Sequence, residues 1–292
     1  MDDYRAASLY GWSSVATDWA QLTYRIDRQL QAAADWMIHE LALEPGERVL
    51  ELAGGPGTVS MMAARAVSPG GHVIYSDFAE PMVDAARDRL QGEGAPGVEY
   101  RVIDAETIDL PDASVEAVAC RMGYMLMADP AAALRESARV LAPGGRIALA
   151  VWSDPVSNPW GALPMQAVAS ELGAPPAPAG APGLWALADE ARLKGLLEDA
   201  GFQSIRIEKL DDAVEFESAE QWIEVTRRLA GPLKALLANL DDDTRGAIED
   251  RMREAAKPYE LPDGRISMPE QILAASARVS QRAAQRSEPN SP

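Results

Sequence analysis

An acidic residue followed by a glycine-rich turn is the pattern in this chain that most directly indicates chemistry. An apolar segment runs into Glu51, and the turn 53–57 (AGGPG) then leads into a helical pattern. Because glycine lacks a Cβ, such a turn lets the backbone approach a ligand closely, while the acidic residue argues against a bare phosphate. Asp77 follows about twenty residues after Gly57, at the end of a second apolar segment. The pattern predicts an adenosine-type ligand at the carboxyl end of a parallel sheet.

Histidine, the side chain that most often acts as a general base, is scarce in the sequence. The chain has two histidines and one cysteine, so we expect no metal centre built from these residue types. His39 is the candidate base by residue type, although a packed or solvent-facing helix residue is the reading we favour. Tyr10, Tyr24 and Tyr124 could orient an acceptor, and each is also explained as pocket wall or core.

Strands and helices must position these residues, and they alternate regularly from residue 47 to 152. Apolar strand patterns occupy 49–52, 72–76, 98–103, 115–120 and 146–152, and helical patterns occupy 58–67, 81–90 and 131–141. Such alternation predicts a parallel sheet with helices on both faces. After a helix at 187–200, we expect two further strands, 202–209 and 213–216, joined as an antiparallel hairpin.

The segments outside this core differ from it in composition. Residues 1–44 have a helical period and many aromatics, and they would form either a lid over the ligand or a cap that buries its aromatics on the sheet. We expect a core at 45–217 with an irregular insert at 153–188, then a helical region at 218–284. The polar tail 285–292 is expected to be disordered.

Composition limits the partners of this 292-residue chain. Its formal net charge of -18 disfavours nucleic acid and an anionic membrane surface as partners. No apolar stretch approaches the length of a membrane span, and the first residues do not read as a secretory signal. We therefore expect a cytoplasmic protein with a small-molecule partner; helix packing in the C-terminal region could also hold a homodimer together.

The order of elements and motifs resembles the class I S-adenosylmethionine-dependent methyltransferases over residues 45–217. The resemblance implies a Rossmann-like fold: a seven-stranded, mostly parallel sheet with a terminal antiparallel hairpin, plus N-terminal and C-terminal helical additions. It also implies S-adenosylmethionine as the cofactor. Ala53 departs from the family pattern, which usually has its first glycine there, and Gly54 could supply the missing freedom.

The resemblance assigns cofactor roles residue by residue. Asp77 would accept hydrogen bonds from the ribose hydroxyls, Phe78 would pack on the adenine, and Asp104 would read its amine. Arg121 would line the methionine end, with Glu51 below the sulfonium. The implied cofactor-binding set is Glu51, Ala53, Gly54, Gly55, Gly57, Asp77, Phe78, Met82, Asp104, Ala105, Glu106 and Arg121.

A second stretch, from Cys120 to Arg146 and on to Trp160, is similar to the ubiquinone/menaquinone-biosynthesis branch of that family. This branch implies methyl transfer to a small, apolar or aromatic metabolite by in-line displacement. The expected acceptor contacts are Tyr10, Trp19, Tyr124, Trp152 and Trp160. Two alternatives stay open: a non-methylating protein that binds the cofactor, and an NAD(P)-dependent oxidoreductase. Against the latter, Ser60 stands where dinucleotide sites have a third glycine.

Overall fold

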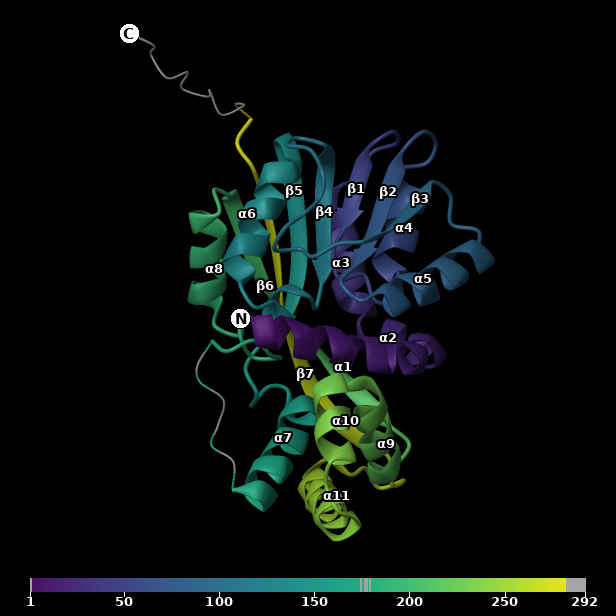
Figure 1. Cartoon of the computed structure of the whole chain (residues 1–292), viewed down its shortest axis with the longest axis vertical. Helices are drawn as coiled ribbons and strands as arrows, with labels where there is room; N and C mark the ends of the chain where they lie inside the picture. Colours follow the sequence, from purple (N-terminus) through teal and green to yellow (C-terminus); the bar gives the residue numbers. More distant parts are fainter. Residues whose placement is uncertain (1, 174, 176–177, 179, 282–292) are drawn as a thin grey trace.

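The computed structural model describes residues 2–173, 175, 178 and 180–281. Its centre is a seven-stranded sheet of order β3-β2-β1-β4-β5-β7-β6, in which only β7 is antiparallel to its neighbours (Figure 1). The strands are β1 (Arg48–Glu51), β2 (His72–Asp77), β3 (Val98–Val102), β4 (Val115–Arg121), β5 (Leu141–Trp152), β6 (Gln203–Phe216) and β7 (Ile266–Arg278). The predicted fold class is therefore confirmed.

Helices cover the sheet and extend beyond its carboxyl end. Along the chain they are α1 (Asp2–Gln21), α2 (Thr23–Gln29), α3 (Gln31–Leu41), α4 (Thr58–Ala66), α5 (Glu80–Gly92), η1 (Tyr124–Leu126), α6 (Pro130–Val140), α7 (Pro159–Leu172), α8 (Glu190–Asp199), α9 (Ala219–Leu229), α10 (Gly231–Ala238), α11 (Asp242–Ala256) and η2 (Lys257–Tyr259). Helices α3 and α4 pack behind the strands in Figure 1, and α6 lies in front of β5. Helix α1 crosses the carboxyl end of the sheet, between it and α9–α10.

The two largest apolar clusters hold most of these layers together. The larger one joins the sheet to the helices on its faces and includes Leu50, Val118 and Leu149, each fully buried. The second lies beyond the sheet, where α7, α9, α10 and α11 pack on the ends of β6 and β7 around the fully buried Trp222. The indole of Trp222 donates to the Trp160 carbonyl at 3.0 Å, which ties α9 to α7.

Helix α6 shows how the local sequence places an element. The Asp129 carboxylate accepts a hydrogen bond from the Ala132 amide at 2.9 Å, and Pro130 occupies the first turn, where its missing N–H costs nothing. The apolar stripe of the helix, which includes Leu134 and Val140, is buried on the sheet. The helix is thus positioned both by its cap and by its buried face.

Three predictions about elements were wrong. The hairpin expected within 202–216 is one long strand, β6, and its antiparallel partner is β7, inside the region expected to be helical. The sheet therefore extends beyond the predicted core boundary at 217, and only part of 218–284 is helical. The insert expected to be irregular contains the helix α7. Residues 285–292, expected to be disordered, lie outside the described residues.

Candidate cofactor site

A cavity of about 130 Å³ lies between the carboxyl ends of the strands and helix α1. The strand ends and the loops after them contribute Ala53, Gly54, Gly55, Pro56, Asp77, Phe78, Met82, Ile103, Asp104, Ala105, Glu106, Arg121, Met122, Gly123, Leu126, Met127 and Ala128. The N-terminal helices contribute Tyr4, Arg5, Ser8, Trp12, Trp19 and Leu30.

The turn after β1 needs small residues for two different reasons. Ala53, Gly55 and Gly57 have φ angles of 50°, 50° and 80°, a left-handed region that favours glycine. Gly54 has no such angle; a Cβ added there would overlap the ring of Tyr75. The expectation that Gly54 supplies the freedom that Ala53 lacks is therefore wrong. Ala53 itself adopts the left-handed conformation, and a Cβ added at Gly123 would lie 2.6 Å from its methyl, so Gly123 makes room for it.

Asp77 joins the end of β2 to the glycine turn. Its Oδ2 accepts a hydrogen bond from the Gly55 amide at 3.1 Å, and its Oδ1 accepts one from the Ala79 amide at 3.0 Å. Burial raises the pKa of this carboxyl, and the backbone amides of Ala79, Gly55 and Phe78 oppose that rise. Each carboxylate oxygen has a second lone pair, so Asp77 can accept further hydrogen bonds from a diol in the cavity.

Glu51 and Arg121 are both buried near the glycine turn; Arg121 belongs to the cavity lining and Glu51 does not. The Glu51 carboxylate accepts the Ser60 amide at 2.9 Å, near the N-terminus of α4. Burial raises its pKa to about 7, although Ser60 and the charge of Arg121 lower it. Burial likewise lowers the pKa of Arg121, whose Nη1 donates to the Leu30 carbonyl at 3.3 Å. An ammonium group beside Glu51 would favour the ionised form of this carboxyl.

Glu106 holds the loops around the cavity together. Its Oε1 accepts hydrogen bonds from the backbone amides of Ala128 and Asp129 at 2.8 and 3.1 Å. Its Oε2 forms an ion pair with Arg5 from α1. These contacts use part of its acceptor capacity, and Glu106 also lines the cavity, so its contact with a cofactor stays a prediction. The Oδ1 of Asp104 accepts the Glu106 amide at 2.9 Å, and Asp104 still lines the cavity.

Helix α1 forms the wall opposite the strand ends. Trp19 lies over the glycine turn, since a Cβ added at Gly55 would be 3.6 Å from its ring. Its indole donates to the Leu229 carbonyl at 3.0 Å, and its ring packs edge-on against Trp12, with centroids 5.6 Å apart. Among the residues of this wall, only Trp19 was predicted as a contact. The density of aromatic residues in 1–44 is the signal that could have indicated Tyr4 and Trp12.

Several predicted site residues lie away from the cavity lining. Tyr10 and Tyr24 are 71% and 81% exposed, and the ring of His39 is 83% exposed beside Glu40. Tyr124 is fully buried, and its hydroxyl shares a 2.6 Å hydrogen bond with Ser137 on α6. These four predictions are corrected: the helix faces that carry the first three turn outward, and Tyr124 is a core residue.

The remaining predicted residues lie beside the cavity or below it. Trp152 and Trp160 pack against each other with centroids 4.7 Å apart, outside the lining. Glu51 lies beneath the lining, and Gly57 is the N-cap of α4. The other ten predicted cofactor contacts lie around one cavity, and their contact with a cofactor stays a prediction.

Within the described ranges, no group of three or more acidic, histidine or cysteine side chains could hold a metal ion. In the same part of the chain, no helix is long and apolar enough to cross a membrane.

Comparison with known proteins adds independent observations. A model of the methyltransferase domain family matches residues 49–145. A ubiquinone/menaquinone biosynthesis C-methyltransferase of Teredinibacter turnerae is 31% identical over 174 residues, which cover 56% of this chain and 70% of the relative. An enzyme of the same name from Pseudomonas putida is 36% identical over 114 residues, 39% of this chain and 44% of the relative. A 37.1 kDa transposon protein of Streptomyces fradiae is 42% identical, but the chain spans only 32% of its length.

Solved structures agree on the fold. A candidate methyltransferase of Bacillus halodurans C-125 aligns with a TM-score of 0.60 and 23% identity, covering 85% of this chain and 99% of that one. The YcgJ protein of Bacillus subtilis aligns with a TM-score of 0.58 and 18% identity, covering 86% and 100%. At these identities the similarity shows the fold alone.

The strand order, the cavity at the glycine turn and the similarity to the Teredinibacter turnerae enzyme define the class: the chain belongs to the class I S-adenosylmethionine-dependent methyltransferases. Within that class it falls in the branch of the ubiquinone/menaquinone biosynthesis C-methyltransferases. S-adenosylmethionine is the cofactor of this class, and the cavity fits its ribose: the turn offers close backbone, and Asp77 offers acceptors for a diol.

Proposed function

We propose that this protein transfers the methyl group of S-adenosylmethionine to a small apolar or aromatic metabolite. The observation that carries the proposal is the cavity itself, which is lined by Asp77 and the glycine turn together with aromatic and methionine side chains. The relatives named as ubiquinone/menaquinone C-methyltransferases support a quinol-like acceptor and a carbon atom as the methylated position.

The residues around the cavity would act by binding and orientation. The bound sulfonium supplies both the electrophilic methyl group and its leaving group, so positioning is the main contribution asked of the protein. Trp12, Trp19 and Met127 offer apolar contact to an acceptor, and helix α1 would exclude water as a lid. The described lining contains no histidine, which favours an acceptor that is acidic or nucleophilic without a strong base.

A binding experiment tests the cofactor part of the proposal. We expect S-adenosylhomocysteine to bind in calorimetry and Asp77→Ala to weaken binding at least tenfold, because the variant removes two acceptor oxygens and releases the Gly55 amide. Asp84→Asn, an exposed carboxylate on α5, is the matched control. A folded wild-type protein that fails to bind S-adenosylhomocysteine would contradict the proposal.

A product experiment tests the transfer itself. The protein is incubated with S-adenosylmethionine and a panel of quinols, phenols and aliphatic alcohols, and the products are examined for the mass increase of one methyl group. We expect the quinols and phenols to react. Cofactor binding without methylation of any member would favour the non-methylating alternative.

A further inference from the structure

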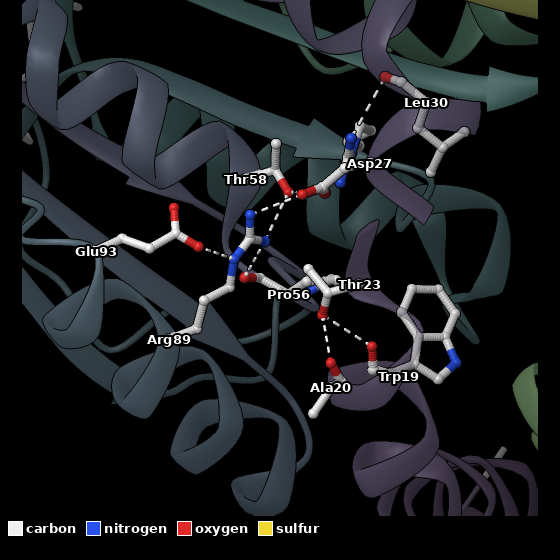
Figure 2. A network of polar contacts seen from close by, with 10 residues as sticks. Trp19, Ala20, Thr23, Asp27, Leu30, Pro56, Thr58, Arg89 and Glu93 are labelled. Atoms are coloured by element: carbon white, nitrogen blue, oxygen red, sulfur yellow. Dashed lines mark hydrogen bonds and ion pairs between the residues drawn. The ribbon is translucent and has the colours of Figure 1, made fainter. Parts of the chain in front are cut away.

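A half-buried polar network lies beside the glycine turn and joins it to the N-terminal helices (Figure 2). At its centre, the Arg89 guanidinium on α5 donates from Nη1 to the Pro56 carbonyl at 3.0 Å and to Oγ1 of Thr58 at 3.1 Å. Its Nη2 pairs with Oδ2 of Asp27 on α2 at 2.7 Å, and its Nε pairs with Glu93 at 2.8 Å. The side chains of Arg89 and Asp27 are each only 18% exposed.

Asp27 also binds the first residue of α4. Its Oδ1 accepts a hydrogen bond from the Thr58 hydroxyl, and Thr58 follows directly after the N-cap Gly57, which has no side chain to cap the helix. A carboxylate at a helix N-terminus is stabilised by the helix dipole and by the unpaired amides there. Asp27 on α2 therefore places a carboxylate beside the first turn of α4.

The same short helix reaches the cavity at its other end. Three residues beyond Asp27, the Leu30 carbonyl accepts Nη1 of Arg121, and both Leu30 and Arg121 line the cavity. At the start of α2, the Thr23 hydroxyl donates to the carbonyls of Trp19 and Ala20 at 3.0 and 2.9 Å, which holds the end of α1. Figure 2 shows two groups of contacts that α2 connects: Arg89 with Glu93, Pro56, Thr58 and Asp27, and Thr23 with Trp19 and Ala20.

We propose that Asp27 and Arg89 are positioning residues that couple the docking of α1 and α2 to the cofactor-binding shape of the glycine turn. The inference rests on the proposed function. Arg89 binds Pro56 and Thr58, and Asp27 binds Thr58, on the side of the turn that faces α5. Trp19 and Leu30, which belong to the N-terminal helices, line the cavity. A ligand that orders the turn must then also order α2. By thermodynamic linkage, loss of the Asp27–Arg89 pair must weaken binding of that ligand.

Calorimetry and hydrogen exchange on the full chain test this coupling. Asp27→Asn keeps the shape of the side chain and removes its charge; Asp84→Asn makes the same change in an exposed ion pair with Arg87 on α5. We expect Asp27→Asn to weaken S-adenosylhomocysteine binding about tenfold or more. We also expect it to abolish the protection from hydrogen exchange that the ligand gives to residues 23–41. Asp84→Asn should match the wild type within about twofold, as expected of an exposed pair.

The outcomes separate this inference from the proposed function. The inference is overturned if Asp27→Asn keeps wild-type affinity and wild-type protection, whether or not its stability is lowered. Asp27 and Arg89 would then have a structural role only. If Asp27→Asn does not fold, Thr58→Val removes the hydroxyl shared by Asp27 and Arg89, and the same loss of affinity is expected of it. Failure of the wild type to bind would instead contradict the proposed function.

Discussion

At the scale of single residues, Glu51 links cofactor binding to pH. Burial holds its pKa at about 7 in the ligand-free protein, so the carboxyl is largely protonated below that pH. A cationic ammonium beside it would lower the pKa, and the carboxyl would then release a proton on binding. We expect S-adenosylhomocysteine affinity to rise between pH 5 and 7.

The measurement is calorimetry at pH 6 in buffers of different ionisation enthalpy. The observed binding enthalpy should depend on the buffer in the wild type and lose most of that dependence in Glu51→Gln. A buffer-independent enthalpy in the wild type would show that Glu51 does not meet the ammonium group.

Ala53 is the second residue with a specific expectation. Its left-handed φ of 50° strains any side chain, and only the missing side chain of Gly123 leaves space for its methyl. Ala53→Gly should therefore stabilise the fold by about 1 kcal/mol in urea unfolding and leave cofactor affinity unchanged. A loss of stability in this variant would mean that the methyl packs against Gly123 more favourably than its backbone angle is strained.

The predictable and unpredictable parts of the site differ in how local their cause is. The turn 53–57 and Asp77 were predictable because each lies where a strand ends, and strand ends of a parallel sheet meet at one edge. Arg5 and Tyr4 were not, since they lie about a hundred residues from their partners Glu106 and Leu126. Nothing in the residues around them signals such a long-range contact.

At the scale of elements, β7 shows why local preference misled the sequence reading. The segment 266–278 (ISMPEQILAASAR) is rich in helix formers, yet it pairs with β5 along one side and β6 along the other. Pro269 is tolerated because it lies beyond the end of β5 pairing, where only β6 is hydrogen-bonded to the strand. Tertiary pairing, which a local window cannot detect, decided the element.

Helix α1 depends on charges that come from distant elements. The Asp18 carboxylate accepts hydrogen bonds from Nε of Arg228 and Nζ of Lys234, both at 2.8 Å. Burial raises the pKa of Asp18, but these two cations outweigh burial and leave the pKa below its usual value. Asp18 is therefore ionised at neutral pH and holds α1 to α9 and α10.

Asp18→Asn should loosen α1 without unfolding the sheet. Since hydrogen bonds to charged groups contribute about 1.5–3 kcal/mol, we expect hydrogen exchange of α1 to accelerate roughly tenfold or more, while β1 and β4 keep their protection. Equal acceleration in the sheet strands would show that α1 does not open separately from the core.

At the scale of the whole molecule, two buried carboxyls make stability depend on pH. Glu270 on β7 is 2% exposed, and its carboxylate accepts Nε2 of Gln29 on α2 at 2.7 Å. Burial raises its pKa to about 8, although Gln29 opposes that rise. Between the unfolded value near 4.5 and pH 8, the native state keeps a proton that the unfolded chain releases. Stability should therefore fall as pH rises through this window, and Glu51 adds to the same trend up to about pH 7.

Glu270→Gln tests this dependence, because the amide keeps an acceptor for Gln29 and cannot ionise. We expect the variant to be more stable than the wild type at pH 8, by up to a few kcal/mol, and nearly equal to it at pH 4.5. Denaturant unfolding across pH 4.5–8.5 measures the difference. A wild-type stability that is flat over this range would refute the expectation.

The position of α9, α10 and α11 has a consequence for how such proteins diversify. Phe216, the last residue of β6, is the register partner of Ile266, the first residue of β7. The chain between them therefore leaves and re-enters the sheet at adjacent points, and a segment with neighbouring ends can change in length at little entropic penalty. Another helical module could therefore replace residues 217–265 and change what supports helix α1, while the β5-β7-β6 ladder stays intact.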